Sequence, residues 1–227
     1  MPMINGIRLK VCGLTRIEDA AAAADIGVDY LGFIFYPPSP RHLTSEHYAA
    51  MKDRLPLRKR VAVCVEPTAA ELAGLDKLGF DFFQIHFGVE TPIATLVAWS
   101  QLAGRSRLWL APKLPPAQDV KPEWLPYADN FLLDTFHAEK FGGTGQTGDW
   151  AKFKRHREAH PTKTWILSGG LRADNITTAV TATGARFIDV NSGVEQSPGI
   201  KSPAKLQALV LALHNATKQS NPAYRVI

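Results

Sequence analysis

Short β-prone runs alternate with helical patterns along the whole chain, and this alternation limits the fold more than any other sequence feature. Helical composition is clearest in IEDAAAAADIG and TAAELAGLDKLG, where Thr15-x-x-Glu18 and Thr68-x-x-Glu71 are candidate capping boxes. Because each strand must return by a helical crossover, the pattern predicts an all-parallel sheet and an α/β fold. The predicted strands cover residues 8–12, 29–35, 60–65, 81–86, 107–112, 130–134, 164–168 and 186–190.

A weak internal repeat narrows the choice of α/β fold. Three segments place a glycine before an aromatic residue where a helix leads into a strand: GVDY at 27–30, GFDF at 79–82 and GARF at 184–187. Their separations are close to two and four multiples of roughly 26 residues, a suitable length for one strand–helix unit. The sequence therefore predicts a single-domain (βα)8 barrel over residues 1–227, with residues 218–227 as a polar tail. An open, doubly wound sheet is the alternative.

Composition limits the class of protein. The chain has 227 residues, of which 45% are hydrophobic and 21% are charged, which suits a globular protein with a large core. No apolar run is long enough to span a bilayer, and the N-terminus lacks the order of a signal peptide. We therefore expect a cytoplasmic location and no membrane partner. Cys12 and Cys64 are too few for a disulfide framework or a cysteine-based zinc site, so no metal site is predicted.

The formal net charge of +5 raises the question of nucleic-acid binding. The basic residues are scattered, however, and their densest group, KFKRHR at 152–157, is expected to be the solvated face of a helix. Without a clustered basic stripe, the sequence argues against a nucleic-acid partner and favours a small anionic substrate.

In a barrel of this kind, catalytic groups stand where the strands end. Cys12 ends the first predicted strand and shares a face with Lys10, whose positive charge would favour the reactive thiolate. An inert core cysteine is the alternative, and Cys64 fits that alternative. Asp134 ends the sixth predicted strand, where burial would raise its pKa and let it donate a proton near neutrality. A helix cap or loop hydrogen bond is the alternative for this carboxyl group.

Glycine-containing turns follow the last two predicted strands. Gly169 and Gly170 lie in one turn, and Asn191, Ser192 and Gly193 lie in the other. Backbone N–H groups in such turns can converge on an anion beside a helix N-terminus, which is the usual phosphate position in these barrels. Each glycine could also serve only as a turn residue. Together, the two turns predict a phosphate site.

Three further candidates lie near the same end of the predicted barrel. Arg41 follows the stiff sequence YPPSP and could bind a carboxylate through two hydrogen bonds, although an exposed arginine is the alternative. His86 ends the fourth strand on the same face as Gln84; it could orient substrate or be a hydrogen-bonded histidine only, and no proton transfer is assigned to it. Gly143 lies in FGGTGQTG, which lacks a full dinucleotide motif and suits a lid over the substrate.

These segments together resemble the phosphoribosylanthranilate isomerases of tryptophan biosynthesis. LKVCGLT, LGFIFYPPSPR, FQIH, LLDT, GGTGQTGDW, LSGGL followed by Asn175, and DVNSGVEQSPGIK occur in the family's order between Lys10 and Lys201. The resemblance implies a (βα)8 barrel that works without a metal or organic cofactor. It also implies an Amadori rearrangement of N-(5-phosphoribosyl)anthranilate to the 1-deoxyribulose 5-phosphate isomer.

The resemblance assigns roles to residues of this chain. It matches the general base to Cys12, the general acid to Asp134, and the partner of the anthranilate carboxylate to Arg41. It matches the phosphate ligands to the turns at Gly169–Gly170 and Ser192–Gly193. The implied partner is a phosphorylated anthranilate substrate, while self-association and use of the related histidine-pathway aminoaldose stay open.

Three positions depart from the family pattern. Phe87 stands where a glycine usually follows the strand-4 histidine, which puts the shape of that loop in question. Cys64 stands in place of an aromatic or other apolar residue, and Asn191 stands in place of the more usual serine. The first two changes concern shape and packing, whereas the third keeps a polar side chain beside the predicted phosphate site.

Two other functions are alternatives to the isomerase. An aldolase or synthase of the same barrel type would form a Schiff base at a lysine, for which Lys10 and Lys113 are candidates. A phosphosugar-binding barrel without activity is the other, and the pairing of Cys12 with Asp134 at strand ends argues against it.

Overall fold

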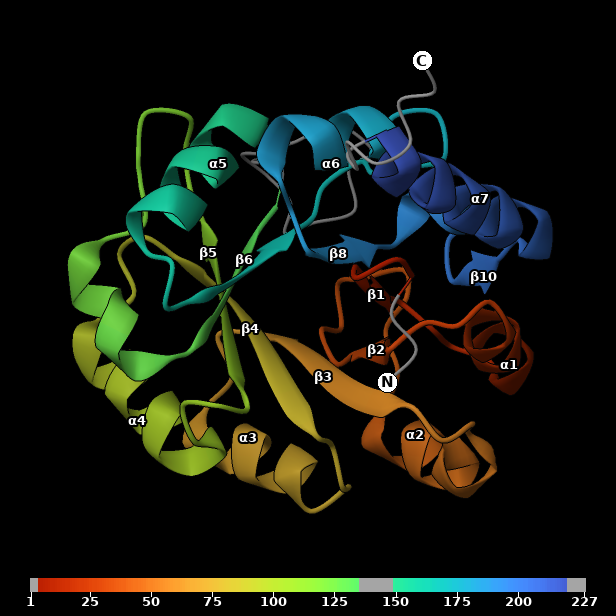
Figure 1. Cartoon of the computed structure of the whole chain (residues 1–227). Helices are drawn as coiled ribbons and strands as arrows, with labels where there is room; N and C mark the ends of the chain where they lie inside the picture. Colours follow the sequence, from red (N-terminus) through yellow and green to blue (C-terminus); the bar gives the residue numbers. More distant parts are fainter. Residues whose placement is uncertain (1–3, 135–148, 220–227) are drawn as a thin grey trace.

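Eight parallel strands close into a barrel in the computed structural model, which describes residues 4–134 and 149–219. Each strand pairs with the next along the chain, and β8 pairs with β1, where Lys10 lies opposite Asp189 (Figure 1). The predicted (βα)8 barrel is confirmed, and the open-sheet alternative is wrong. The strands of the barrel are β1 (Arg8–Val11), β2 (Tyr30–Ile34), β3 (Lys59–Val65), β4 (Phe82–Gly88), β5 (Leu108–Lys113), β6 (Asn130–Leu133), β7 (Thr164–Leu167) and β8 (Phe187–Val190).

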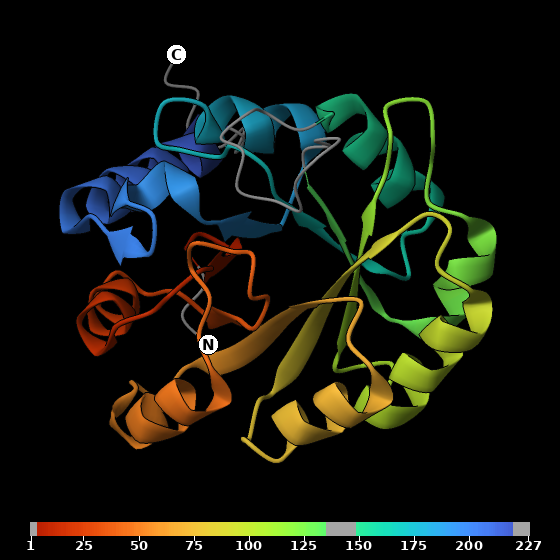
Figure 2. The ribbon, with the colours of Figure 1, turned by 180° about the vertical axis from the view of Figure 1, so that it is seen from behind.

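A ring of helices surrounds the strands (Figures 1 and 2). The α-helices are α1 (Ile17–Asp25), α2 (Ser45–Met51), α3 (Ala69–Asp76), α4 (Ile93–Ala103), α5 (Trp150–Ala159), α6 (Ile176–Thr183) and α7 (Pro203–Gln219), and a short 3-10 helix, η1 (Lys52–Arg54), follows α2. One crossover departs from the expected alternation, because β5 and β6 are joined through a 3-10 helix, η2 (Pro122–Tyr127). Pro126 has no N–H to donate, which disfavours a continuous α-helix in that segment.

The last helix reaches further than the sequence suggested. α7 continues to Gln219, so the tail expected at 218–227 begins inside this helix and otherwise lies outside the described residues. Among the described helices, none combines the length and the apolarity that crossing a bilayer would require.

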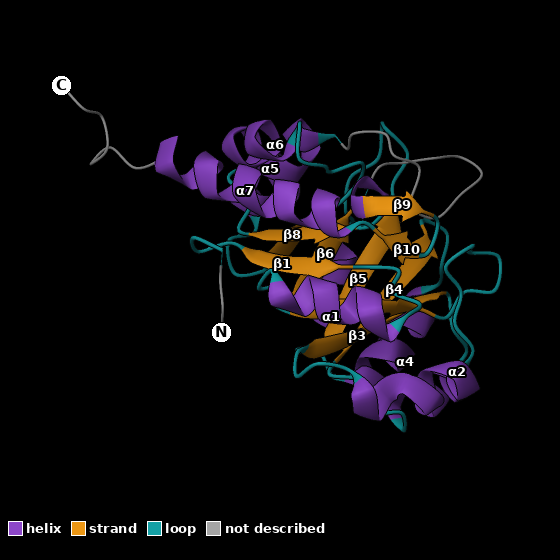
Figure 3. Cartoon of the chain, turned by 90° about the vertical axis from the view of Figure 1, so that its right-hand side faces the viewer, coloured by secondary structure: helices purple, strands orange, loops and turns teal. Residues whose placement is uncertain are grey.

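A small antiparallel hairpin follows β8 (Figure 3). Its elements are η3 (Ser192–Val194), β9 (Glu195–Ser197) and β10 (Ile200–Lys201). The Thr15 hydroxyl donates a 2.7 Å hydrogen bond to the Gly199 carbonyl in the hairpin turn. Thr15 therefore ties this hairpin to the loop after β1 and does not cap α1, whose N-cap is Arg16 without a side-chain bond. The capping box predicted at Thr15 is wrong.

Other helix ends match the sequence pattern. At the start of α3, the Thr68 hydroxyl accepts from the Glu71 N–H at 3.2 Å, and the Glu71 carboxylate accepts from the Thr68 N–H at 2.7 Å. This is the reciprocal capping box that was predicted. The glycines of the repeat, Gly27, Gly79 and Gly184, follow α1, α3 and α6 with φ values of 84°, 84° and 63°.

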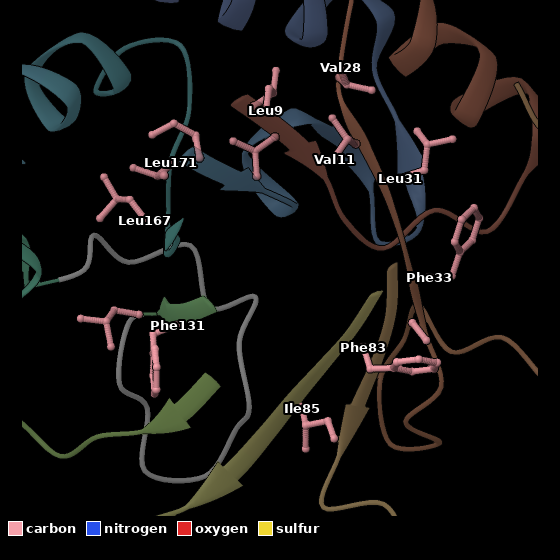
Figure 4. Close-up of a cluster of buried hydrophobic side chains, with 14 of the residues drawn as sticks. Leu9, Val11, Val28, Leu31, Phe33, Phe83, Ile85, Phe131, Leu167 and Leu171 are labelled. Atoms are coloured by element: carbon pink, nitrogen blue, oxygen red, sulfur yellow. The ribbon is translucent and has the colours of Figure 1, made fainter. Parts of the chain in front are cut away.

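Alternation along each strand divides the apolar residues into two cores. Leu9 and Val11 of β1 belong to the layer between the strands and the helices, part of which is shown in Figure 4. Cys12 belongs to a second cluster, which fills the inside of the barrel. Lys10 is fully buried on this inner side, so the barrel interior carries charge as well as apolar surface.

Aromatic rings close the lower end of the barrel, where the strands begin. Tyr30 and Phe187 are stacked with their centroids 4.8 Å apart, and Trp109 meets Phe187 edge to face at 5.2 Å. Phe82 completes the group, 5.6 Å from Tyr30. These rings form a floor beneath the polar residues that follow them along β4 and β8.

The basic run at 152–157 is not simply a solvated face. Lys152 and His156 of α5 are both buried. The Lys152 ammonium donates to the carbonyl groups of Pro115, Pro116 and Gln118 at 3.1, 3.0 and 2.7 Å. The sequence prediction for this run is therefore wrong for these two residues, because α5 uses them to hold the loop after β5.

Phe87 is accommodated by a longer strand. β4 continues to Gly88, and alternation turns Phe87 outward, where it is fully buried. Its ring meets Trp124 edge to face at 5.1 Å and Trp99 at 6.0 Å. The departure from the family pattern thus adds packing between β4, α4 and η2 and leaves His86 on the inner face.

We expect Phe87→Ala to lower the free energy of unfolding by about 3–5 kcal/mol, because it removes a ring packed between two indoles and leaves a cavity. Urea denaturation followed by circular dichroism measures the change. Leu57→Ala is the control, since Leu57 is 90% exposed and its truncation should cost no more than about 0.5 kcal/mol. Equal stabilities of the two variants would show that the Phe87 ring contributes little packing.

Candidate active site

The carboxyl ends of the strands open into a pocket, which we call the mouth pocket. It gathers residues from seven of the strand ends and loops into one space, including nearly every site residue predicted from the sequence. Gly143 is the exception, because it lies outside the described residues. The predicted residues that line the mouth pocket are Cys12, Arg41, His86, Asp134, Gly169, Gly170, Asn191, Ser192 and Gly193.

Cys12 follows β1 and is almost completely buried beside a charged group. The Lys10 ammonium lies 2.9 Å from an Asp189 carboxylate oxygen, and its positive charge acts on the Cys12 thiol. Burial raises the pKa of the Cys12 thiol, and the positive charge of Lys10 opposes that rise. Burial is the largest single influence and disfavours the Lys10 ammonium, but Asp189 and Cys12 together outweigh it and raise the Lys10 pKa.

Lys10 is therefore a poor candidate for Schiff-base chemistry. A lysine must lose its proton before it can attack a carbonyl group. This lysine is buried as a paired ammonium, and its Nζ atom already donates to Asp189 and Gln84. The aldolase-type alternative loses one of its two candidate residues.

Cys64, the other cysteine, lies in the outer core with 2% of its surface exposed. Burial raises the pKa of its thiol to about 12, so it stays protonated at neutral pH. The structure therefore supports its interpretation as an inert core residue.

Asp134 directly follows β6. Leu132 packs inside the barrel and Leu133 packs outside it, so alternation turns Asp134 toward the interior. Asp134 lines the mouth pocket and also a second pocket, which Lys152 and Phe153 of α5 line as well. Cys12 and Asp134 thus reach the same space from β1 and β6, which β7 and β8 separate in the ring.

His86 is held on the inner face at the end of β4. Its Nε2 atom lies 2.8 Å from the side-chain nitrogen of Gln84. Burial, with a smaller contribution from the Lys10 charge, lowers the pKa of His86 to about 4. The imidazole is therefore neutral at physiological pH, and it cannot act there as a cationic acid.

Arg41 is buried, so its alternative as an exposed arginine is wrong. Its Nε and Nη2 atoms donate to the two carboxylate oxygens of Glu195 at 2.8 and 2.6 Å. Lys201 contacts the same carboxylate at 2.8 Å and the Asn191 side-chain oxygen at 2.9 Å. Burial opposes ionisation of Glu195, but hydrogen bonds from Arg41 and Lys201 lower its pKa overall. One edge of the guanidinium therefore holds Glu195, and Nη1 takes no part in that pair.

The two turns predicted to bind phosphate pack tightly together. Gly169 and Gly170 have φ values of 95° and 59°, which L-residues with a side chain rarely adopt. A Cβ atom at Gly193 would overlap the Leu171 carbonyl oxygen, so only glycine allows the turn after β8 to approach the turn after β7. Asn175 fixes the latter by donating to the Gly170 carbonyl at 2.9 Å.

Gly13 lies where three loops meet. Its φ value is 71°, and a Cβ atom there would lie 2.6 Å from both the Arg41 Cδ atom and the Asn191 side-chain oxygen. The loop after β1 therefore sets the space available to Arg41 and Asn191.

We expect Gly13→Ala to displace Arg41 and Asn191 and to weaken substrate binding, in addition to the backbone cost of a positive φ. Gly27→Ala is a matched control, because Gly27 has a φ of 84° and nothing within 4 Å of its added methyl group. Both variants should lose about 1 kcal/mol of stability from the backbone alone. Only Gly13→Ala should raise KM in steady-state kinetics; equal KM values for both variants would contradict this role of Gly13.

The sequence did not single out Asp189, Glu195 or Lys201. Alternation could have identified Asp189, because it follows inward-facing Phe187 by two residues in the run FIDV. Glu195 and Lys201 lie in a hairpin that the sequence pattern did not predict, and the contact of Glu195 with Arg41 spans 154 residues of chain. Within the described ranges, no cluster of three or more acidic, histidine or cysteine side chains could hold a metal ion.

Comparison with known sequences gives consistent matches over nearly the whole chain. The sequence matches the N-(5'-phosphoribosyl)anthranilate (PRA) isomerase family over residues 9–212. An N-(5'-phosphoribosyl)anthranilate isomerase from Pseudomonas putida (strain GB-1) is 38% identical over 215 residues. That match covers 92% of this chain and 98% of the relative.

Solved structures agree. The phosphoribosyl anthranilate isomerase from Thermus thermophilus superposes with a TM-score of 0.76 at 31% identity, covering 92% of this chain and 99% of the other. A phosphoribosyl anthranilate isomerase in complex with reduced 1-(O-carboxyphenylamino)-1-deoxyribulose 5-phosphate superposes with a TM-score of 0.71 at 28% identity, with the same coverage of both chains.

Proposed function

Because this chain belongs to the N-(5'-phosphoribosyl)anthranilate isomerase family, we propose that Cys12 and Asp134 are the proton acceptor and proton donor of its reaction. The chain is an isomerase that converts N-(5'-phosphoribosyl)anthranilate from an aldose to a ketose derivative in tryptophan biosynthesis. The observation that supports the assignment is that both side chains line the mouth pocket from well-separated strands. An acid and a base can therefore act on one sugar from two sides.

Asp134 acts first in this proposal. Its carboxylic acid gives a proton to the ring oxygen of the ribose as the bond between that oxygen and C1 breaks. The nitrogen lone pair then forms a C1–N double bond, and the opened sugar carries an iminium ion. Asp134 is left as a carboxylate, which stabilises the positive charge that has formed.

Cys12 acts second. The iminium ion makes the hydrogen on C2 acidic, and the Cys12 thiolate removes it, leaving a neutral enolamine that tautomerises to the ketone. The thiolate is disfavoured by burial in the ligand-free protein, but Lys10 and the iminium charge both stabilise it when it is needed. The catalyst is restored when the proton on Cys12 is lost and Asp134 regains one, so the reaction is a net isomerisation.

The remaining residues would bind the two ends of the substrate. The turns at Gly169–Gly170 and Ser192–Gly193 suit the phosphate group, since their geometry brings backbone groups of two loops together. Arg41 would bind the anthranilate carboxylate through the part of its guanidinium that Glu195 does not use. The cytoplasmic location stays a prediction, and self-association and use of the histidine-pathway aminoaldose stay open.

We expect Cys12→Ala and Asp134→Asn each to lower kcat by about 100- to 10,000-fold, because each removes one proton transfer. Loss of substrate fluorescence on addition of the purified protein measures turnover. Cys64→Ala is the control, since it removes a buried thiol outside the mouth pocket and should retain the wild-type kcat. A Cys12→Ala or Asp134→Asn enzyme that works within tenfold of the wild type would reject that residue's role.

Arg41→Lys tests the carboxylate contact while keeping a positive charge beside Glu195. We expect KM for the anthranilate substrate to rise about 10- to 100-fold, the value of a charged hydrogen-bonded pair. A phosphoribosylated aniline, which lacks the carboxylate, should be used equally well by the variant and the wild type. Arg172→Lys is the control, because Arg172 pairs with Asp174 outside the mouth pocket. If the variant handled both substrates equally poorly, Arg41 would have only a structural role.

A further inference from the structure

A buried row of hydrogen-bonded polar side chains crosses the barrel interior from β1 to β4 and ends at His86. The Lys10 ammonium donates to the Gln84 side-chain oxygen at 2.9 Å, and the Gln84 side-chain nitrogen lies 2.8 Å from His86 Nε2. Lys10 is fully buried and Gln84 is 2% exposed. This row joins the lysine beside Cys12 on β1 to the histidine that lines the mouth pocket from β4.

The direction of each hydrogen bond in this row follows from which groups can donate and which can accept. An ammonium group can only donate, so the Gln84 atom facing Lys10 must be the amide oxygen. The amide nitrogen then faces His86, and an amide nitrogen can also only donate. His86 Nε2 must therefore accept, which it can do only when it carries no proton.

We propose that Lys10 and Gln84 fix His86 as the neutral tautomer with its proton on Nδ1, and that this N–H group donates a hydrogen bond to an oxygen of the opened sugar. The second half of this inference rests on the proposed function, whereas the first half concerns the ligand-free protein alone. Lys10 and Gln84 are positioning residues here, and His86 is the residue that contacts substrate.

Two features keep the donor-to-acceptor direction of these hydrogen bonds from reversing. Asp189 holds the proton on Lys10 through its 2.9 Å ion pair, so Lys10 cannot become an acceptor. Burial and the nearby Lys10 charge keep His86 from taking a second proton near neutral pH. The imidazole is therefore left with one donor, fixed before the substrate arrives.

A fixed neutral donor suits the later part of the reaction. The oxygen on C2 changes from a hydroxyl to a carbonyl as the enolamine becomes the ketone, and it gains negative charge on the way. A donor that is already oriented stabilises such an oxygen without reorganisation, and it keeps its own proton because a neutral imidazole is a very weak acid. This division leaves proton transfer to Cys12 and Asp134.

Nuclear magnetic resonance of the ligand-free protein tests the tautomer directly. With 15N-labelled histidine, long-range 1H–15N correlation distinguishes a protonated ring nitrogen from a bare one. We expect His86, assigned by its loss in His86→Asn, to show a bare Nε2 and a protonated Nδ1 between pH 6 and 8. A protonated Nε2, or an imidazolium at pH 7, would overturn the proposal.

Gln84→Glu is the matched variant. The carboxylate still accepts from Lys10, but it presents an acceptor to His86 instead of a donor, so the His86 proton should move to Nε2. His156, which contacts Asp119 outside the barrel, should keep its signals in both proteins and serves as an internal control. An unchanged His86 tautomer in Gln84→Glu would show that Gln84 does not determine it.

Kinetics test the donor role separately. The amide nitrogen of asparagine can take the place of Nδ1, and that of glutamine can take the place of Nε2. We expect His86→Asn to keep kcat within about tenfold and His86→Gln to lose about 100-fold or more, the range found for removal of one oriented donor. Equal losses of kcat in the two variants would reject the role of His86 as a hydrogen-bond donor to substrate, and the tautomer found by nuclear magnetic resonance would be unaffected. Absence of turnover in the wild type would instead reject the proposed function.

Discussion

The ion pair of Lys10 and Asp189 inside the barrel is the interaction on which the catalytic end of this protein depends. A buried ammonium is costly unless every one of its protons finds a partner, and removing one member of such a pair usually destabilises a protein by several kcal/mol. Here the hydrogen-bond partners of the ammonium are Asp189 of β8 and Gln84 of β4. The charge that holds these strands in register is also the charge beside Cys12, so folding and reactivity share one group.

A second buried charge organises the loops. The Glu195 carboxylate binds Arg41 from the loop after β2 and Lys201 from β10, and Lys201 reaches Asn191 at the end of β8. Gly13 from the loop after β1 packs against Arg41 and Asn191, which Glu195 and Lys201 hold. Loops far apart in the sequence thus take their positions from one carboxylate, and the part of Arg41 that faces a ligand is set by the part that faces Glu195.

The sequence was sufficient for whatever depends on local pattern. Strand alternation placed Cys12, His86 and Asp134 on the inner side of the barrel, and the glycine repeat indicated the number of strand–helix units. Local pattern failed where distant segments compete for one residue. Thr15 has the spacing of a helix cap, but the hairpin turn at Gly199 takes its hydroxyl. Lys152 belongs to a basic run, but the carbonyl groups of the loop after β5 bury its ammonium. Such outcomes depend on which loops meet, and this information is not local.

The aromatic rings that form the floor of the barrel determine where substrate enters and product leaves the active site. Four aromatic rings fill the end of the barrel where the strands begin: Tyr30, Phe82, Trp109 and Phe187. The active site therefore opens only at the carboxyl ends of the strands. Whatever enters must leave by the same opening, and an occupant blocks the next arrival. The ketose product must therefore leave through the same opening before another aldose substrate can bind.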